Sequence, residues 1–126
     1  MYYFSTKSKD TFNDVITRVK EVLKGEGFGI LTEIDVKAKM KEKLDKDMED
    51  YVILGACNPP FAFEALQVET KIGTMLPCNV IVRQDKDDVE IAAVDPVASM
   101  AAIKNVKLQG VAEEIRNRLK RVIDAV

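Results

Sequence analysis

The sequence has 126 residues, of which 47% are hydrophobic and 32% are charged, and its formal net charge is −2 at pH 7. We expect a single soluble domain over residues 1–126, because a chain of this length can bury a sufficient core without a disulfide or a structural metal. The weakly acidic balance argues against a dedicated nucleic-acid-binding protein, and the lack of histidine excludes Ser-His-Asp and Cys-His catalysis and the HExxH metal site.

Aromatic and β-branched residues predict a first strand over residues 2–6. A helix follows, capped at its start by Ser8 or Asp10 and ended by Gly25. The glycine-rich stretch at 25–29, GEGFG, lies between a helix and a strand, so we interpret it as a helix stop and not as a phosphate-binding loop. One face of the helix carries six apolar residues at helical spacing: Phe12, Val15, Ile16, Val19, Val22 and Leu23.

The middle of the chain alternates between strand and helix patterns. FGILTEI predicts a strand over 28–34, and a short amphipathic helix follows, marked by Val36, Met40 and Leu44. YVILGAC, at 51–57, is apolar on both faces, which is typical of a central strand covered on both sides. Residues 59–69 then predict a short helix.

The last third of the chain predicts a hairpin and a long helix. CNVIVRQ at 78–84 and VEIAAV at 89–94 are strands joined by the short turn DKDD, so we expect them to pair in antiparallel fashion. A short helical piece follows at VASMAAI. The final helix carries an apolar stripe that needs a sheet or a partner to cover it: Leu108, Val111, Ala112, Ile115, Leu119, Val122, Ile123 and Val126.

The order of these elements, β-α-β-α-β-α-β-β-α, predicts a two-layer α+β fold with a largely antiparallel sheet and a long C-terminal helix. No apolar run approaches the roughly 20 residues that a membrane helix requires. The first residues, MYYFSTKSKD, also lack the basic and apolar regions of a secretory signal. We therefore expect a cytoplasmic protein without a membrane partner, in which both cysteines are reduced thiols.

The stretch GACNPPFAFEAL joins a strand to a helix through a cysteine, an asparagine and two prolines. Asn58 is suited to cap the helix and to accept the N–H of Phe61, while Pro59 and Pro60 occupy the first two helical positions. Cys57 precedes this cap, close to the positive end of the helix dipole, where the pKa of a thiol can fall. The alternative is that Cys57 is a small buried apolar residue.

The same construction recurs after a later strand, where Asp95 and Pro96 follow Ala93 and Val94. If 51–57, 78–84 and 89–94 are consecutive antiparallel strands, both Asx-Pro ends emerge at one end of the sheet. Cys78, the first residue of the middle strand, then lies between them. We therefore predict that four residues form a ligand-binding rim: Cys57, Asn58, Cys78 and Asp95. Two alternatives stay open: the two thiols form a redox pair, or the rim is only structural and each residue caps or packs its own turn.

Three functions remain open for this rim. The first is a non-enzymatic binding domain for a small apolar ligand, or for a soft metal ion such as zinc held by Cys57, Cys78 and Asp95. The second is an enzyme that uses Cys57 or Cys78 as a thiolate, assisted by Asp95 or Glu64. The third is a dimeric interaction module whose surface includes Phe63, which lies off the apolar stripe of its helix.

Four stretches of the chain resemble the domain-of-unknown-function 302 family of small bacterial and archaeal proteins: GFGILTEIDVKAKMKEKL, YVILGACNPPFAFEAL, LPCNVIV and AAVDP. The resemblance implies a TATA-binding-protein-like fold, in which a curved antiparallel sheet packs against a long helix, often in a homodimer. It implies no established activity and no catalytic residue. Its signature set comprises Cys57, Asn58, Pro59, Pro77, Cys78, Asp95 and Pro96.

Overall fold

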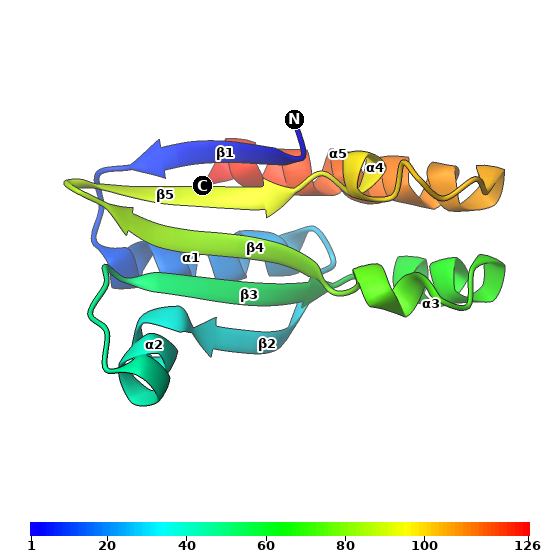
Figure 1. Cartoon of the computed structure of the whole chain (residues 1–126). Coiled ribbons are helices and arrows are strands. Elements are labelled where there is room, and N and C mark those ends of the chain that lie inside the picture. The colour runs from blue at the N-terminus through cyan, green and yellow to red at the C-terminus, as the bar shows by residue number, and fades with distance from the viewer.

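Five strands form one antiparallel sheet in the order β1-β5-β4-β3-β2 in the computed structural model, which describes residues 1–126 (Figure 1). The strands are β1 (Tyr3–Ser8), β2 (Gly29–Asp35), β3 (Tyr51–Cys57), β4 (Cys78–Asp85) and β5 (Asp88–Val94). The helices are α1 (Phe12–Gly25), α2 (Val36–Leu44), α3 (Pro59–Val68), α4 (Pro96–Ser99) and α5 (Val106–Ala125), with a 3₁₀ helix, η1 (Ile72–Met75). The predicted order of elements and the predicted β4–β5 hairpin are confirmed.

Helices α1 and α5 cover one face of the sheet, behind the strands in Figure 1. The strands contribute alternate residues to this layer, such as Val80 and Val82 of β4 and Ile91 of β5, all of which are fully buried. The predicted apolar stripe of α5 forms the other side of the core, with seven buried residues: Leu108, Val111, Ala112, Ile115, Leu119, Val122 and Ile123. The two-layer α+β prediction is therefore confirmed.

The opposite face of the sheet is not covered by α1 or α5, so the prediction that β3 is covered on both sides is wrong. β4 is the central strand, and Tyr51 and Ile53 of β3 point to the uncovered face and remain partly exposed. Both sides of β3 are apolar, but this pattern does not require that both sides are covered, because a sheet with one open face can carry apolar side chains on that face. The sheet thus presents one surface without an internal partner.

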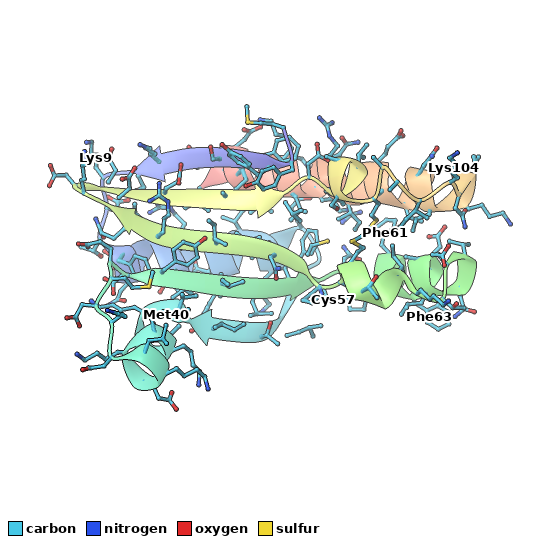
Figure 2. The ribbon with its side chains drawn as sticks, in the orientation of Figure 1. Lys9, Met40, Cys57, Phe61, Phe63 and Lys104 are labelled. Carbon is cyan, nitrogen blue, oxygen red and sulfur yellow. The ribbon has the colours of Figure 1, made fainter.

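Helix α2 begins and ends where the sequence predicts but buries none of its residues. Asp35 caps its start by accepting the N–H of Ala38 at 2.9 Å. Met40 and Leu44, the predicted apolar face, are 38% and 63% exposed, and Figure 2 shows Met40 on this outlying helix. The predicted amphipathic packing is therefore wrong, because α2 lies beside the β2 and β3 strands and has no layer to pack against.

The start of α1 also differs from the prediction. Thr11 is the cap, and its hydroxyl accepts the N–H of Asp14 at 3.3 Å, whereas Ser8 and Asp10 bind Arg18. The predicted helix stop is confirmed, because α1 ends at Gly25. Gly27 then takes a φ of +87°, a left-handed conformation that favours glycine.

The antiparallel order β5-β4-β3 brings three chain segments to one end of the sheet, as the sequence predicts. Cys57 ends β3 and Asp95 follows β5, while Cys78 begins β4 between them, paired with Ala56. Helices α3 and α4 and the first half of α5 extend the molecule beyond this end (Figure 1). None of the helices combines the length and the apolar character needed to cross a membrane.

A candidate binding pocket at the end of the sheet

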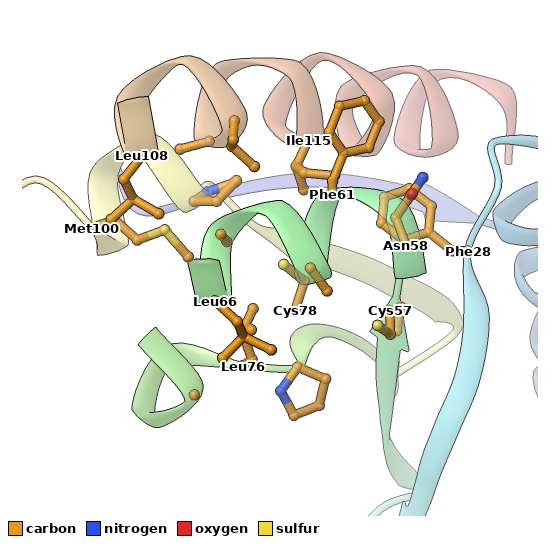
Figure 3. Close-up of a pocket in the computed structure, with 18 of the residues that line it drawn as sticks. Phe28, Cys57, Asn58, Phe61, Leu66, Leu76, Cys78, Met100, Leu108 and Ile115 are labelled. Atoms are coloured by element: carbon orange, nitrogen blue, oxygen red, sulfur yellow. The ribbon is translucent and has the colours of Figure 1, made fainter. Parts of the chain in front are cut away.

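A cavity of about 340 Å³ lies where the ends of β3 and β4 meet α3 and the first half of α5 (Figure 3). Of the 19 residues that line it, 15 are hydrophobic, and the others are a glycine, two prolines and Asn58. Its walls come from five segments of the chain, represented by Phe28, Cys57, Leu76, Met100 and Ile115. Segments far apart in the sequence thus enclose one apolar hollow.

Helix α3 forms a wall of the cavity because two prolines begin it directly after β3. Pro59 and Pro60 occupy its first two positions, where the missing N–H groups cost no helical hydrogen bond. The helix then directs Phe61 and Ala65 toward α5, while Phe63 lies on its other side and is 66% exposed (Figure 2). The prediction that Phe63 lies outside the apolar stripe agrees with this position.

Cys57 and Cys78 both line the cavity, and both are free thiols. Burial raises the pKa of Cys57, and burial with a further contribution from Cys57 raises the pKa of Cys78 to about 11. The expectation that the helix dipole lowers the pKa of Cys57 is therefore wrong, because removal from water disfavours the thiolate more than the dipole favours it. Both groups are neutral near pH 7.

Asn58 is 6% exposed and lines the cavity, but it does not cap α3 with its side chain. The predicted bond from the N–H of Phe61 is absent. The Asn58 amide lies instead against the turn after α1, where Nδ2 donates to the carbonyl of Glu26 at 3.4 Å. A Cβ at Gly27 would lie 2.9 Å from Nδ2, so glycine at this position makes room for the amide.

Asp95 is a cap, as predicted, and is 7% exposed. Its Oδ1 accepts the N–H groups of Val97 at 3.0 Å and Ala98 at 3.4 Å, and its Oδ2 accepts from Nε of Arg116 at 3.2 Å. Pro96, the next residue, lines the cavity, but Asp95 does not. Asp95 therefore supports the cavity wall with a carboxylate that already has its partners.

The structure does not bring Cys57, Cys78 and Asp95 together as a metal site. No group of three or more Cys, Asp or Glu side chains is arranged to hold a metal ion. The Asp95 carboxylate is engaged by a helix start and by Arg116, which leaves two thiols, whereas a structural zinc site has four protein ligands. Cys57, Asn58 and Cys78 remain together as members of the cavity wall.

The sequence did not identify several lining residues. Leu108, Val111, Ala112 and Ile115 belong to the apolar stripe of α5, for which the sequence predicts only that a sheet or a partner covers it, and Met100 lies beyond the short α4. A signal was available, because α5 has 20 residues, or about 30 Å at 1.5 Å per residue, and a strand of seven residues spans only about 23 Å. Part of its apolar stripe therefore had to pack against something other than the sheet.

The fold and the cavity define a class: small α+β proteins with a half-covered antiparallel sheet and an apolar pocket at one end of it. A family model described as "Domain of unknown function DUF302" matches residues 4–126, so the chain belongs to the DUF302 family. A crystal structure described as an uncharacterized conserved protein DUF302 from Bacillus stearothermophilus is similar over 99% of this chain and 98% of its own, with a TM-score of 0.93 and 30% identity. No curated protein matches the chain.

Proposed function

We propose that this protein binds a small apolar molecule in the cavity between α3 and α5. The observation that carries the proposal is an open hollow of about 340 Å³ in which 15 of 19 lining residues are hydrophobic. This volume lies within the roughly 300–1,000 Å³ of small-molecule pockets, which also combine apolar walls with few polar groups. Free thiols at Cys57 and Cys78 suit a reducing compartment such as the cytoplasm.

The charges around the cavity favour a neutral ligand. No Asp, Glu, Lys or Arg lines it, and its two thiols have raised pKa values. The same facts weigh against a thiolate enzyme, because neither cysteine is activated, Asp95 is bound to Arg116 and Glu64 is exposed on α3. A soft metal ion is disfavoured on geometric grounds, since no group of three or more Cys, Asp or Glu side chains is arranged to hold it.

Saturation-transfer NMR with naphthalene tests the proposal, because naphthalene is neutral and has no hydrogen-bonding group. We expect saturation transfer in the wild-type protein and its loss in Ala62→Phe, which places an aromatic ring in the cavity wall. Ala38→Phe, on the unpacked helix α2, is the matched control and keeps the signal. Absence of transfer in the wild type, or equal transfer in Ala62→Phe, would contradict the proposal. Native mass spectrometry of freshly purified protein then identifies any co-purified ligand.

A second candidate function is homodimer formation through the uncovered face of the sheet. A hollow of about 450 Å³ on this face is lined by seven hydrophobic residues of nine, including Tyr2, Tyr51 and Ile81. Charges at one end of the face are already paired within the chain, as in Arg83–Glu90 at 2.7 Å. A second copy of the chain, related by a two-fold axis, would therefore cover apolar surface without burying an unpaired charge.

Light scattering after size exclusion tests the dimer and separates it from the Phe63 surface. We expect a wild-type dimer, a monomer for Ile81→Lys, and an unchanged dimer for Phe63→Ala. A monomeric wild-type protein, or a dimer that survives Ile81→Lys, would contradict the sheet-face interface. A monomeric Phe63→Ala variant would favour α3 as the dimer surface in its place.

A further inference from the structure

Asn58 is the only residue with a strong hydrogen-bonding side chain among the 19 that line the cavity. It is 6% exposed, and the only hydrogen bond of its side chain is the long one from Nδ2 to the carbonyl of Glu26 at 3.4 Å. The Glu26 carbonyl can only accept, so the amide group that faces it must be the NH₂. This fixes the orientation of the side chain and leaves Oδ1 as an acceptor that no protein group satisfies.

Asn58 Oδ1 accepts no hydrogen bond from the chain although the residue is nearly buried, so this acceptor is available to a donor from outside. Asp95 shows the contrast at the neighbouring helix start, where both carboxylate oxygens accept hydrogen bonds from the chain. The two residues occupy equivalent positions, after β3 and after β5, but only Asn58 has an unused acceptor beside a cavity (Figure 3). A ligand with an N–H or O–H group would supply the missing donor.

Five sulfur-containing or aromatic side chains stand among the aliphatic residues that form most of the cavity wall. Cys57, Cys78 and Met100 contribute three sulfur atoms, and Phe28 and Phe61 contribute two rings. Thiols and thioethers are polarizable and make favourable contacts with aromatic rings. Aromatic side chains also prefer offset or edge-to-face contact with a further ring. These five side chains offer a planar aromatic body contacts that a saturated chain would not make.

The one cation near Asn58 is already engaged. Arg118 donates from Nη1 to the Glu26 carbonyl at 2.9 Å and from Nε to Glu114 at 3.1 Å, and its guanidinium lies over the Phe61 ring, with Cζ 5.1 Å from the centroid. A carboxylate in the cavity would meet the lone pairs of Asn58 Oδ1 and no free cation. An anionic ligand is therefore disfavoured.

We infer that the ligand is a neutral aromatic compound with one hydrogen-bond donor, of the phenol or indole type, whose donor binds Asn58 Oδ1 while its ring lies among the sulfur and aromatic groups. The inference rests on the proposed function, since it names the ligand class for the same cavity. It assigns Asn58 as the residue that sets specificity.

Two isomeric probes isolate the donor. 3-Methylindole carries an N–H, whereas 1-methylindole has the same size and apolar surface and no donor. The protein contains no tryptophan, so the fluorescence of either probe reports binding directly. We expect wild-type protein to bind 3-methylindole roughly five- to tenfold more tightly, the worth of one neutral hydrogen bond. Asn58→Leu, an isosteric variant without the acceptor, should bind both isomers equally.

Each outcome has a distinct meaning. Equal binding of the isomers by the wild type overturns the donor inference but leaves the cavity as a binding site, and this comparison does not depend on whether Asn58→Leu folds. No binding of either isomer, with no saturation transfer from naphthalene, overturns the proposed function itself. Tighter binding of indole-3-carboxylate than of 3-methylindole overturns the assignment of a neutral ligand. Persistence of the isomer preference in Asn58→Leu places the acceptor at another residue.

Discussion

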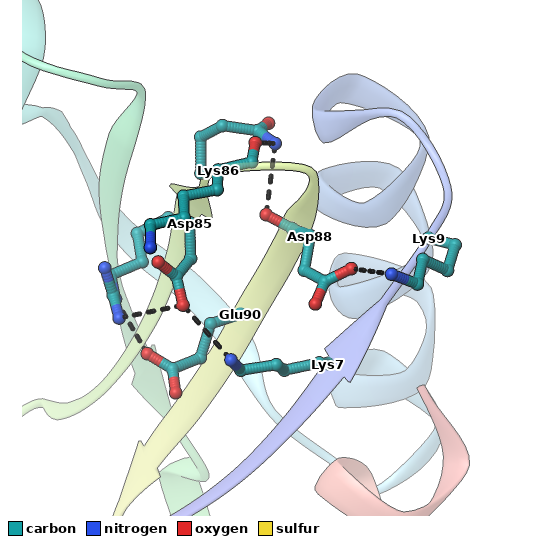
Figure 4. A network of polar contacts seen from close by, with 8 residues as sticks. Lys7, Lys9, Asp85, Lys86, Asp88 and Glu90 are labelled. Carbon is teal, nitrogen blue, oxygen red and sulfur yellow. Dashed lines mark hydrogen bonds and ion pairs between the residues drawn. The ribbon is translucent and has the colours of Figure 1, made fainter.

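The two ends of the sheet satisfy their polar groups in opposite ways. At the β4–β5 turn, charged side chains from three strands pair with one another, including Lys7–Asp85 at 3.1 Å and Arg83–Glu90 at 2.7 Å (Figure 4). Lys7 lowers the pKa of Asp85, which favours the ionised form of that carboxylate. At the other end, Cys57 and Cys78 are held neutral by burial.

This difference separates a structural end of the molecule from an end that can accept a ligand. The turn encloses no large cavity, and its carboxylates have partners within the chain. The opposite end encloses a cavity and includes Asn58, which has a free acceptor. Paired charges at an exposed turn already have their partners, whereas an acceptor beside an apolar hollow that receives no hydrogen bond from the chain is available to a ligand.

The largest expected effect comes from two truncations on α5 that compare the solid core with the cavity wall. Leu119 is fully buried beneath the sheet, while Ile115, one turn earlier, lines the cavity. We expect Leu119→Ala to lower the free energy of unfolding by about 3–4 kcal/mol and Ile115→Ala by only about 1–2 kcal/mol, because Ile115 already borders empty space. Urea unfolding measures both. Equal losses would mean that the cavity is closed in solution.

The second effect is a dependence of stability on pH that arises at the cavity end. The pKa of Cys78 rises from 9.0 to about 11 in the folded protein, so the unfolded thiol releases its proton first as the pH increases. The neutral thiol of Cys78 makes its full contribution to the free energy of unfolding below pH 9. This contribution, at most roughly 2–3 kcal/mol, is lost between about pH 9 and 11.

The measurement compares wild-type protein with Cys78→Ala by urea unfolding from pH 8 upward. As the pH rises, the free energy of unfolding of the wild-type protein should fall relative to that of Cys78→Ala, because alanine has no proton to release. Cys57→Ala is the control, because Cys57 is the more accessible thiol. The difference in the free energy of unfolding between this variant and the wild type should change less with pH. A pH-independent difference for Cys78→Ala would mean that the thiol is solvated in the folded state.

The sequence predicted the elements and their meeting point because both depend on local patterns. Helical spacing identified α1 and α5, and antiparallel pairing of adjacent segments placed Cys57 and Cys78 at one end of the sheet. It did not predict the uncovered face or the unpacked helix α2. Those features depend on which surfaces remain after the layers have packed, and no single segment contains that information.

The chemistry of the site was less predictable than its location. Asn58 and Asp95 appear equivalent in sequence, yet Asp95 caps its helix and Asn58 turns away to the carbonyl of Glu26. That choice depends on Gly27, which lies 31 positions earlier and leaves space for the amide. The pKa values of the thiols likewise depend on their burial in the folded chain.

The third expected effect concerns Asp95, whose two carboxylate oxygens both accept hydrogen bonds from the chain. Asp95→Asn keeps one oxygen to cap α4 but loses the charge that binds Arg116. Because Arg116 is partly exposed, we expect a loss of only about 1 kcal/mol in the free energy of unfolding. Affinity for 3-methylindole should change less than twofold, since Asp95 does not line the cavity. A larger loss of affinity would show that α4 positions the cavity wall.

The smallest effect is expected at the charged end. Glu90→Gln removes the ion pair with Arg83, and we expect it to cost less than about 1 kcal/mol, because paired charges at a surface gain little over their hydrated state. Urea unfolding at low salt and at about 1 M salt checks the cause, since screening should remove most of the difference. Unchanged affinity for 3-methylindole would confirm that the two ends act independently. A Glu90→Gln variant that weakens binding would instead couple the turn to the cavity through β4 and β5, the two strands that connect them.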